Sequence, residues 1–162
     1  FNYLYNREVF PEPQAVFSKA KVLPGIDGRK MSKSYGNTIP FGAGPEEMWE
    51  RIRMMTTDPQ RIKKTDPGHP EVCIVYAFHK VFNPEEYEEI GARCSAGEIG
   101  CVECKKRLAE KMNALLADIH TKREELSKKP EYIKEVLDYG AQRARKEAEK
   151  TMAEVKTAMN VL

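Results

Sequence analysis

The chain has 162 residues, 41% of them hydrophobic and 32% charged, and its formal net charge is only +2. This length accommodates one or two small domains, and because the overall charge is near zero, any nucleic-acid-binding role has to reside in local basic patches. No apolar run approaches membrane-spanning length, so no membrane-spanning helix is expected within this sequence. The chain begins with Phe1 rather than methionine, which leads us to expect a fragment of a longer protein.

The part of the chain before Gly44 is expected to be extended and rich in turns. Residues 14–23 contain valine, phenylalanine and leucine at a density that predicts a strand. Proline, glycine and aspartate follow one another in residues 24–28 and predict a turn.

From Pro45 onward the pattern becomes helical. A proline at a first helical position, followed by two glutamates, indicates a helix start, and Met48, Trp49 and Ile52 give this helix one apolar face. A loop is predicted over residues 56–71, and further helices are predicted over residues 71–82, 84–92 and 102–126 and from Pro130 toward the C-terminus. The sequence therefore predicts a mainly α fold, a helical bundle preceded by a remnant of α/β material.

The segment GRKMSKSYGNTI places two lysines, Lys30 and Lys33, in a glycine-bracketed stretch with Met31, Ser32 and Ser34. A lysine ammonium on its long stem is a movable point charge that suits phosphate oxygens. A loop that serves nucleotide chemistry is expected to move, so that it closes over the phosphates when charge develops there. The alternative is a solvated basic turn without a ligand.

The four cysteines, Cys73, Cys94, Cys101 and Cys104, are spaced C-x20-C-x6-C-x2-C. Four thiolates are a complete ligand set for a tetrahedral ion or an iron–sulfur cluster. No histidine adjoins them in the sequence, so an all-thiolate set is expected, and the spacing is not the paired C-x2-C pattern of zinc ribbons. The alternative is a group of unrelated free cysteines.

The pentapeptide KMSKS at Lys30 to Ser34 resembles, letter for letter, the signature loop of class I aminoacyl-tRNA synthetases. The segments TDPQRIKKTDPGHPE and YGAQRARKEAEKTM are similar to the tryptophanyl-tRNA synthetase family, and the resemblance covers essentially the whole chain. It implies the C-terminal portion of such an enzyme. Residues 1–44 would be the end of a Rossmann-like catalytic domain with the KMSKS loop, and residues 45–162 an α-helical anticodon-binding domain.

This resemblance implies ATP-dependent activation of tryptophan and its transfer to tRNA(Trp), in a cytoplasmic enzyme that is a homodimer when full length. Lys33 is expected to contact the ATP phosphates and Lys30 to assist it, with Met31, Ser32 and Ser34 completing the binding of ATP with its Mg²⁺. The first signature of class I enzymes and the tryptophan pocket are not found in this sequence, so residues 1–162 alone are expected to be inactive.

The cysteine spacing is similar to that of tryptophanyl-tRNA synthetases that hold a [4Fe–4S] cluster near the anticodon-binding region. This resemblance implies that Cys73, Cys94, Cys101 and Cys104 bind such a cluster, with Zn²⁺ as the alternative. Lys105, Lys106 and Arg107 adjoin the cysteines and are the favoured candidates for tRNA phosphate contacts; a solvated helix face is the alternative. Two other functions stay open: the C-terminal part of a tyrosyl-tRNA synthetase, and a stand-alone metal-stabilised RNA-binding helical module.

Overall fold

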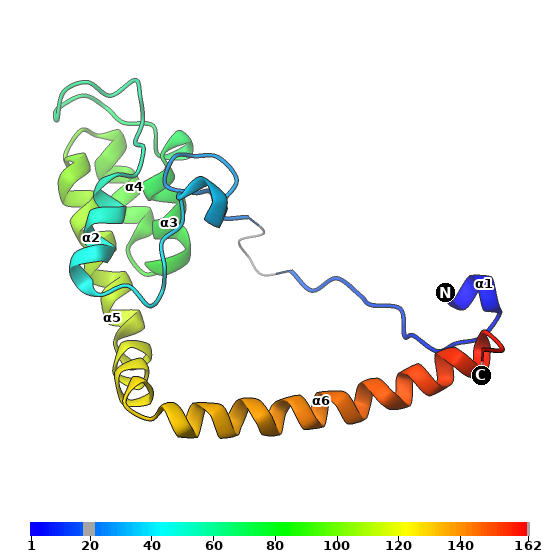
Figure 1. The fold of residues 1–162 in the computed structure, drawn as a ribbon. Coiled ribbons are helices and arrows are strands. Elements are labelled where there is room, and N and C mark those ends of the chain that lie inside the picture. Colours follow the sequence, from blue (N-terminus) through cyan, green and yellow to red (C-terminus); the bar gives the residue numbers. More distant parts are fainter. Residues whose placement is uncertain (18–21, 162) are drawn as a thin grey trace. The chain divides into compact units, whose positions relative to one another are not determined.

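The computed structural model of the protein describes residues 1–17 and 22–161, and these are mainly helical (Figure 1). The helices are α1 (Asn2–Tyr5), α2 (Pro45–Arg53), α3 (Ile74–Phe82), α4 (Tyr87–Ser95), α5 (Cys101–Ser127) and α6 (Pro130–Ala158), with two 3-10 turns, η1 (Lys33–Tyr35) and η2 (Pro70–Val72). Within the described ranges there is no β-strand, only an isolated bridge between Pro24 and Lys30. No helix among these residues is long and apolar enough to cross a membrane.

The helix starts follow local sequence signals. Helix α2 begins at Pro45, with acidic residues in its first turn, and it buries Met48 and Ile52 as predicted. The predictions of a helix ending at Phe82, of a long helix after residue 100 and of a helix from Pro130 are also confirmed. The helix predicted over 84–92 begins three residues later, because the chain first makes a turn in which the amides of Glu86 and Tyr87 bond to the carbonyl of Asn83.

The strand predicted over residues 14–23 is not formed in the parts that the structure describes, and residues 18–21 lie outside the described residues. Val16 and Val22 are 94% and 79% exposed. A strand needs a neighbour to pair its backbone groups, and the described residues supply none. This prediction was wrong for 14–17 and 22–23 because propensity alone does not make a sheet.

The chain divides into two compact units, one comprising Phe17–Arg123 and the other Phe1–Val16 with Glu124–Leu162. The first unit contains the hydrophobic core, to which α2, α3, α4 and α5 all contribute. Ile26 and Ile39, which flank the KMSKS segment, belong to this same core. Each buried isoleucine stabilises the fold by about 1.5–3 kcal/mol, so both ends of the segment are firmly attached to the helices.

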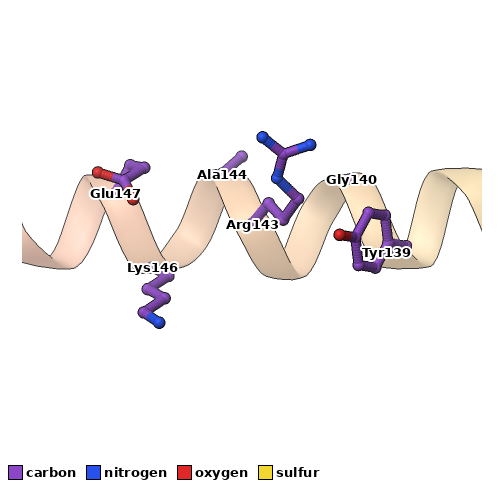
Figure 2. A pocket seen from close by; sticks show the side chains of 6 residues that line it. All are labelled: Tyr139, Gly140, Arg143, Ala144, Lys146 and Glu147. Carbon is purple, nitrogen blue, oxygen red and sulfur yellow. The ribbon is translucent and has the colours of Figure 1, made fainter.

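Helix α6 belongs to the second unit and exposes most of its residues, with Val155 its one buried residue among those described. It runs through Gly140 without a break. A shallow hollow on this helix is lined only by residues of the helix itself (Figure 2), namely Tyr139, Gly140, Arg143, Ala144, Lys146 and Glu147. Because every lining residue comes from one helix, the hollow has no opposite wall and does not form a binding site.

Candidate functional site

The two lysines of the KMSKS segment lie exposed at the surface of the first unit. Lys33 begins the 3-10 turn η1, whose N-cap Ser32 accepts a hydrogen bond on Oγ from the amide of Ser34 at 3.2 Å. Met31 lies between the lysines, is half-buried and packs against the core. The segment is therefore a surface turn held down by a methionine, with Lys30 and Lys33 projecting into solvent.

The base of this segment is fixed by the side chain of Asn37, which is only 2% exposed. Its Oδ1 accepts from the amide of Ser32 at 2.8 Å, and its Nδ2 donates to Asp27 Oδ1 at 2.8 Å and to the Lys30 carbonyl at 3.1 Å. The sequence suggested a freely flexible stretch and did not single out Asn37. The sequence does contain one indication of this role, because Asn37 directly follows Gly36. Such a pair is typical of turns in which the asparagine side chain bonds to nearby backbone.

The glycines beside the lysines take backbone conformations that other residues rarely adopt. Gly28 has φ +83° and Gly36 has φ +62°, both in the left-handed region. The carbonyl of Gly36 accepts a hydrogen bond from Nη1 of Arg51 on α2 at 3.0 Å. These glycines therefore form sharp turns, and at Gly36 the turn is tied to a helix.

The four cysteines come from three helix ends that meet in the first unit. Cys73 immediately precedes α3, Cys94 lies in the last turn of α4, and Cys101 and Cys104 lie in the first turn of α5. Burial, and then the charges of the other three thiols, raise the pKa of Cys104 to about 12. The pKa of Cys94 is also raised, chiefly by burial. Each of the four cysteines thus lies at or beside the end of a helix in the first unit.

The four cysteine side chains do not form a metal coordination sphere in this structure. Among the described residues, no group of three or more His, Cys, Asp or Glu side chains is arranged to hold a metal ion. Cys94 Sγ instead accepts a hydrogen bond from Arg61 Nη1 at 3.6 Å. The described residues therefore contain no formed metal site, and metal binding by the four cysteines stays a prediction.

A histidine lies beside Cys104 in the fold, although no histidine adjoins the cysteines in the sequence. His79 is buried on α3, and its Nε2 is 3.1 Å from the carbonyl oxygen and 3.5 Å from Sγ of Cys104. Because a carbonyl oxygen only accepts, Nε2 carries the proton in this geometry and has no lone pair for a metal. Burial lowers the pKa of His79, which keeps it neutral. The proximity of His79 follows from the packing of α3 against α5, which adjacency in sequence does not reveal, and the all-thiolate ligand set stays a prediction.

The basic residues near the cysteines have different surroundings. A groove of about 500 Å³ runs between the 61–64 segment and the start of α5. Its lining includes the predicted Lys106, and the full set is Arg61, Ile62, Lys63, Lys64, Gly100, Cys101, Val102, Glu103 and Lys106. Arg107 lies outside the lining set and contacts Glu103 at 3.5 Å. Of the three favoured candidates, Lys106 is the one that faces this groove.

Lys105 points elsewhere and closes the end of α2. Its Nζ donates to the carbonyls of Arg53 at 2.8 Å and Met55 at 2.7 Å. The last carbonyls of a helix lack intrahelical partners, and a lysine there satisfies them. The contacts of Lys105 therefore indicate a structural role in place of the predicted phosphate contact.

We expect Lys105→Ala to lower the free energy of unfolding by about 1–3 kcal/mol, because it leaves two carbonyls without a charged donor. The matched control is Lys106→Ala, one residue away on the exposed side, which should change it by less than about 0.5 kcal/mol. Urea denaturation of both variants measures the difference. Equal stability of the two would contradict the capping role of Lys105.

A family model described as tRNA synthetases class I (W and Y) matches residues 2–117. The chain is 45% identical over 163 residues to a tryptophan–tRNA ligase of Aquifex aeolicus, covering 99% of this chain and 41% of that protein. It is 45% identical over 164 residues to a tryptophan–tRNA ligase of Thermotoga maritima, covering 100% and 50%. The chain thus spans about half the length of the curated relatives it matches.

A solved structure of a tryptophanyl-tRNA synthetase is also similar to this chain. The crystal structure of tryptophanyl-tRNA synthetase from Campylobacter jejuni complexed with ADP and tryptophane superposes with a TM-score of 0.76 at 33% sequence identity. The match covers 99% of this chain and 50% of that one.

Proposed function

The chain belongs to the class I tRNA synthetases of the tryptophan and tyrosine family, and on that premise we propose that it is the C-terminal part of an ATP-dependent tryptophan–tRNA ligase. The observation that carries the proposal is 45% identity along essentially the whole chain to two proteins named tryptophan–tRNA ligase. The family description also includes tyrosine enzymes, so the tyrosyl reading is the competing one. A stand-alone RNA-binding module would have no need of the exposed Lys30 and Lys33.

The KMSKS segment is proposed to bind ATP. In the activation step the tryptophan carboxylate attacks the α-phosphorus of ATP, the bond to the bridging oxygen breaks, and pyrophosphate leaves as the adenylate forms. The exposed ammonium of Lys33 would stabilise the charge that develops on the leaving pyrophosphate, with Lys30 beside it. Met31, Ser32 and Ser34 would complete the contact to ATP and its Mg²⁺. In this proposal residues 1–44 are the end of the catalytic domain, and residues 45–162 are the tRNA-binding part.

Two features support the assignment of Lys33. Its side chain has no ion-pair partner in the ranges 1–17 and 22–161, so its ammonium is available to an incoming phosphate. The backbone around it is held by Ser32 and, through Gly36, by Arg51. A free charge on a fixed base is the arrangement that recognition of a transferring phosphate group requires.

We further propose that Cys73, Cys94, Cys101 and Cys104 hold a [4Fe–4S] cluster. Zinc would need all four sulfurs within about 2.3 Å of one ion, whereas in a cluster each thiolate binds a different iron and the ligands stand further apart. The spacing of the four cysteines, which resembles that of cluster-holding members of the family, supports the cluster, with Zn²⁺ as the alternative. When bound, the cluster would supply structural cross-linking of the three helix ends, and tryptophan activation would not involve it.

The tRNA is proposed to lie along the basic groove beside Cys101. Lys63, Lys64 and Lys106 line it, and lysines along a groove attract the phosphates of a nucleic acid. This places the anticodon-binding region next to the cysteine site. The full-length enzyme, meaning the protein that contains this chain, is proposed to be a cytoplasmic homodimer.

The proposal is tested by charging purified tRNA(Trp) with labelled tryptophan and, separately, purified tRNA(Tyr) with labelled tyrosine, using the full-length enzyme and ATP. We expect charging with tryptophan alone. Residues 1–162 alone should charge neither tRNA, because the tryptophan pocket is assigned to the other half of the enzyme. Charging with tyrosine by the full-length enzyme would overturn the proposal in favour of the tyrosyl reading.

A further inference from the structure

We propose that Asn37 is a positioning residue for the activation step: with Asp27 it sets where Lys30 and Lys33 stand. The proposal rests on the phosphate-binding function proposed for these lysines. Asn37 touches no ligand in this scheme. It acts through the backbone that carries the two ammonium groups.

The hydrogen bonds of Asn37 fall on both sides of Met31. Nδ2 holds the carbonyl of Lys30 at 3.1 Å, and Oδ1 holds the amide of Ser32 at 2.8 Å. One side-chain amide therefore fixes the backbone directly after the first lysine and directly before the second. Both lysines share this one anchor.

Asp27 decides which way the Asn37 amide faces. Asp27 Oδ1 accepts from Asn37 Nδ2 at 2.8 Å and from the amide of Arg29 at 3.0 Å, and Oδ2 accepts from Arg29 Nε at 2.7 Å. The hydrogen bond from Asn37, together with those from Arg29, lowers the pKa of Asp27 to about 2. An ionised carboxylate only accepts, so Nδ2 must face Asp27 and Oδ1 is left to face Ser32.

The Asn37 side chain is tightly packed, which limits it to this orientation. A Cβ added at Gly25 would lie 2.3 Å from Asn37 Nδ2, so the backbone at Gly25 packs directly on the amide. The amide of Ile26 donates to the Asn37 carbonyl at 3.0 Å, and the Ile26 carbonyl accepts from Thr56 at 2.9 Å. The anchor is thus joined to the loop that follows α2, and a displaced Asn37 side chain would shift the lysine-bearing turn against the helices.

The test compares four variants of the full-length enzyme in tryptophan-dependent ATP–pyrophosphate exchange. Asn37→Ala should lower kcat by about 10²-fold, because a misplacement of about 1 Å costs that much, while the KM for tryptophan stays unchanged. Asn37→Asp places a second carboxylate against Asp27 and leaves the Lys30 carbonyl without its donor, and Asp27→Ala removes the acceptor that orients the Asn37 amide. Both should lower kcat. Asp27→Asn is the conservative variant, because its Oδ1 still accepts from Asn37 Nδ2, and its kcat should exceed that of Asp27→Ala by about 10-fold or more.

Asn83→Ala is the matched control, because Asn83 is equally buried and contacts His79 and Glu86. It should destabilise the fold but keep the wild-type kcat. If Lys33→Ala leaves exchange intact, the phosphate-binding function of the loop is what fails. If Lys33→Ala is impaired but Asn37→Ala keeps wild-type kcat or loses no more than Asn83→Ala, or if Asp27→Asn loses as much as Asp27→Ala, the positioning role is overturned. Where Asn37→Ala fails to fold, the comparison of Asp27→Ala with Asp27→Asn decides, since Asp27 is only partly buried.

Discussion

Replacing Lys33 by alanine in the full-length enzyme should lower the rate of tryptophan-dependent ATP–pyrophosphate exchange by about 10²-fold or more. Lys33 is exposed, and its proposed contact strengthens as charge moves onto the pyrophosphate. Loss of an interaction made mainly in the transition state lowers kcat and changes substrate binding little. The KM for tryptophan should therefore stay close to that of the wild type.

The matched control is Lys134→Ala, which removes an equally exposed lysine from α6. Exchange requires no tRNA, so this variant should react at the wild-type rate. If the Lys33→Ala variant exchanges at the same rate as the Lys134→Ala control, Lys33 has no role in the activation step.

The cysteine site gives the second large effect. Protein prepared without oxygen should be brown and contain iron and sulfide in cluster proportion, and Cys101→Ser should abolish this colour. Metal binding is coupled to folding where the ligands come from several elements, so the start of α5 should loosen in the variant. Adenylate formation should stay nearly intact, and the defect should appear in the charging of tRNA.

Val102→Ser is the control for this experiment, since Val102 is 62% exposed beside Cys101 and should retain the cluster. If the anaerobic protein is colourless and contains one zinc ion, the cysteines bind zinc and the cluster proposal is wrong. If the protein is colourless and metal-free and the start of α5 is ordered, both the cluster and the zinc alternative are wrong.

Local signals in the sequence predicted the helices well. Pro45 and Pro130 each begin a helix because their fixed φ suits the first turn, where no amide donor is needed. The sequence also predicted that the four cysteines form one site, and each lies at or beside a helix end of the first unit. Whether they bind a cluster stays a prediction.

The features that the sequence did not reveal depend on contacts between distant segments. His79 lies beside Cys104 across two helices, and Lys105 reaches back to the end of α2. The strand over residues 14–23 was expected from composition, but described residues offer it no partner. The rigid base of the KMSKS segment was missed because Asn37 looks like an ordinary turn residue until its three hydrogen-bond partners are known.

We propose that this chain is part of an enzyme that activates tryptophan. The most direct measurement is ATP–pyrophosphate exchange by the full-length enzyme with tryptophan, with tyrosine and without an amino acid. The account predicts exchange with tryptophan that exceeds the other two by orders of magnitude. Exchange supported by tyrosine, or by neither amino acid, would contradict it.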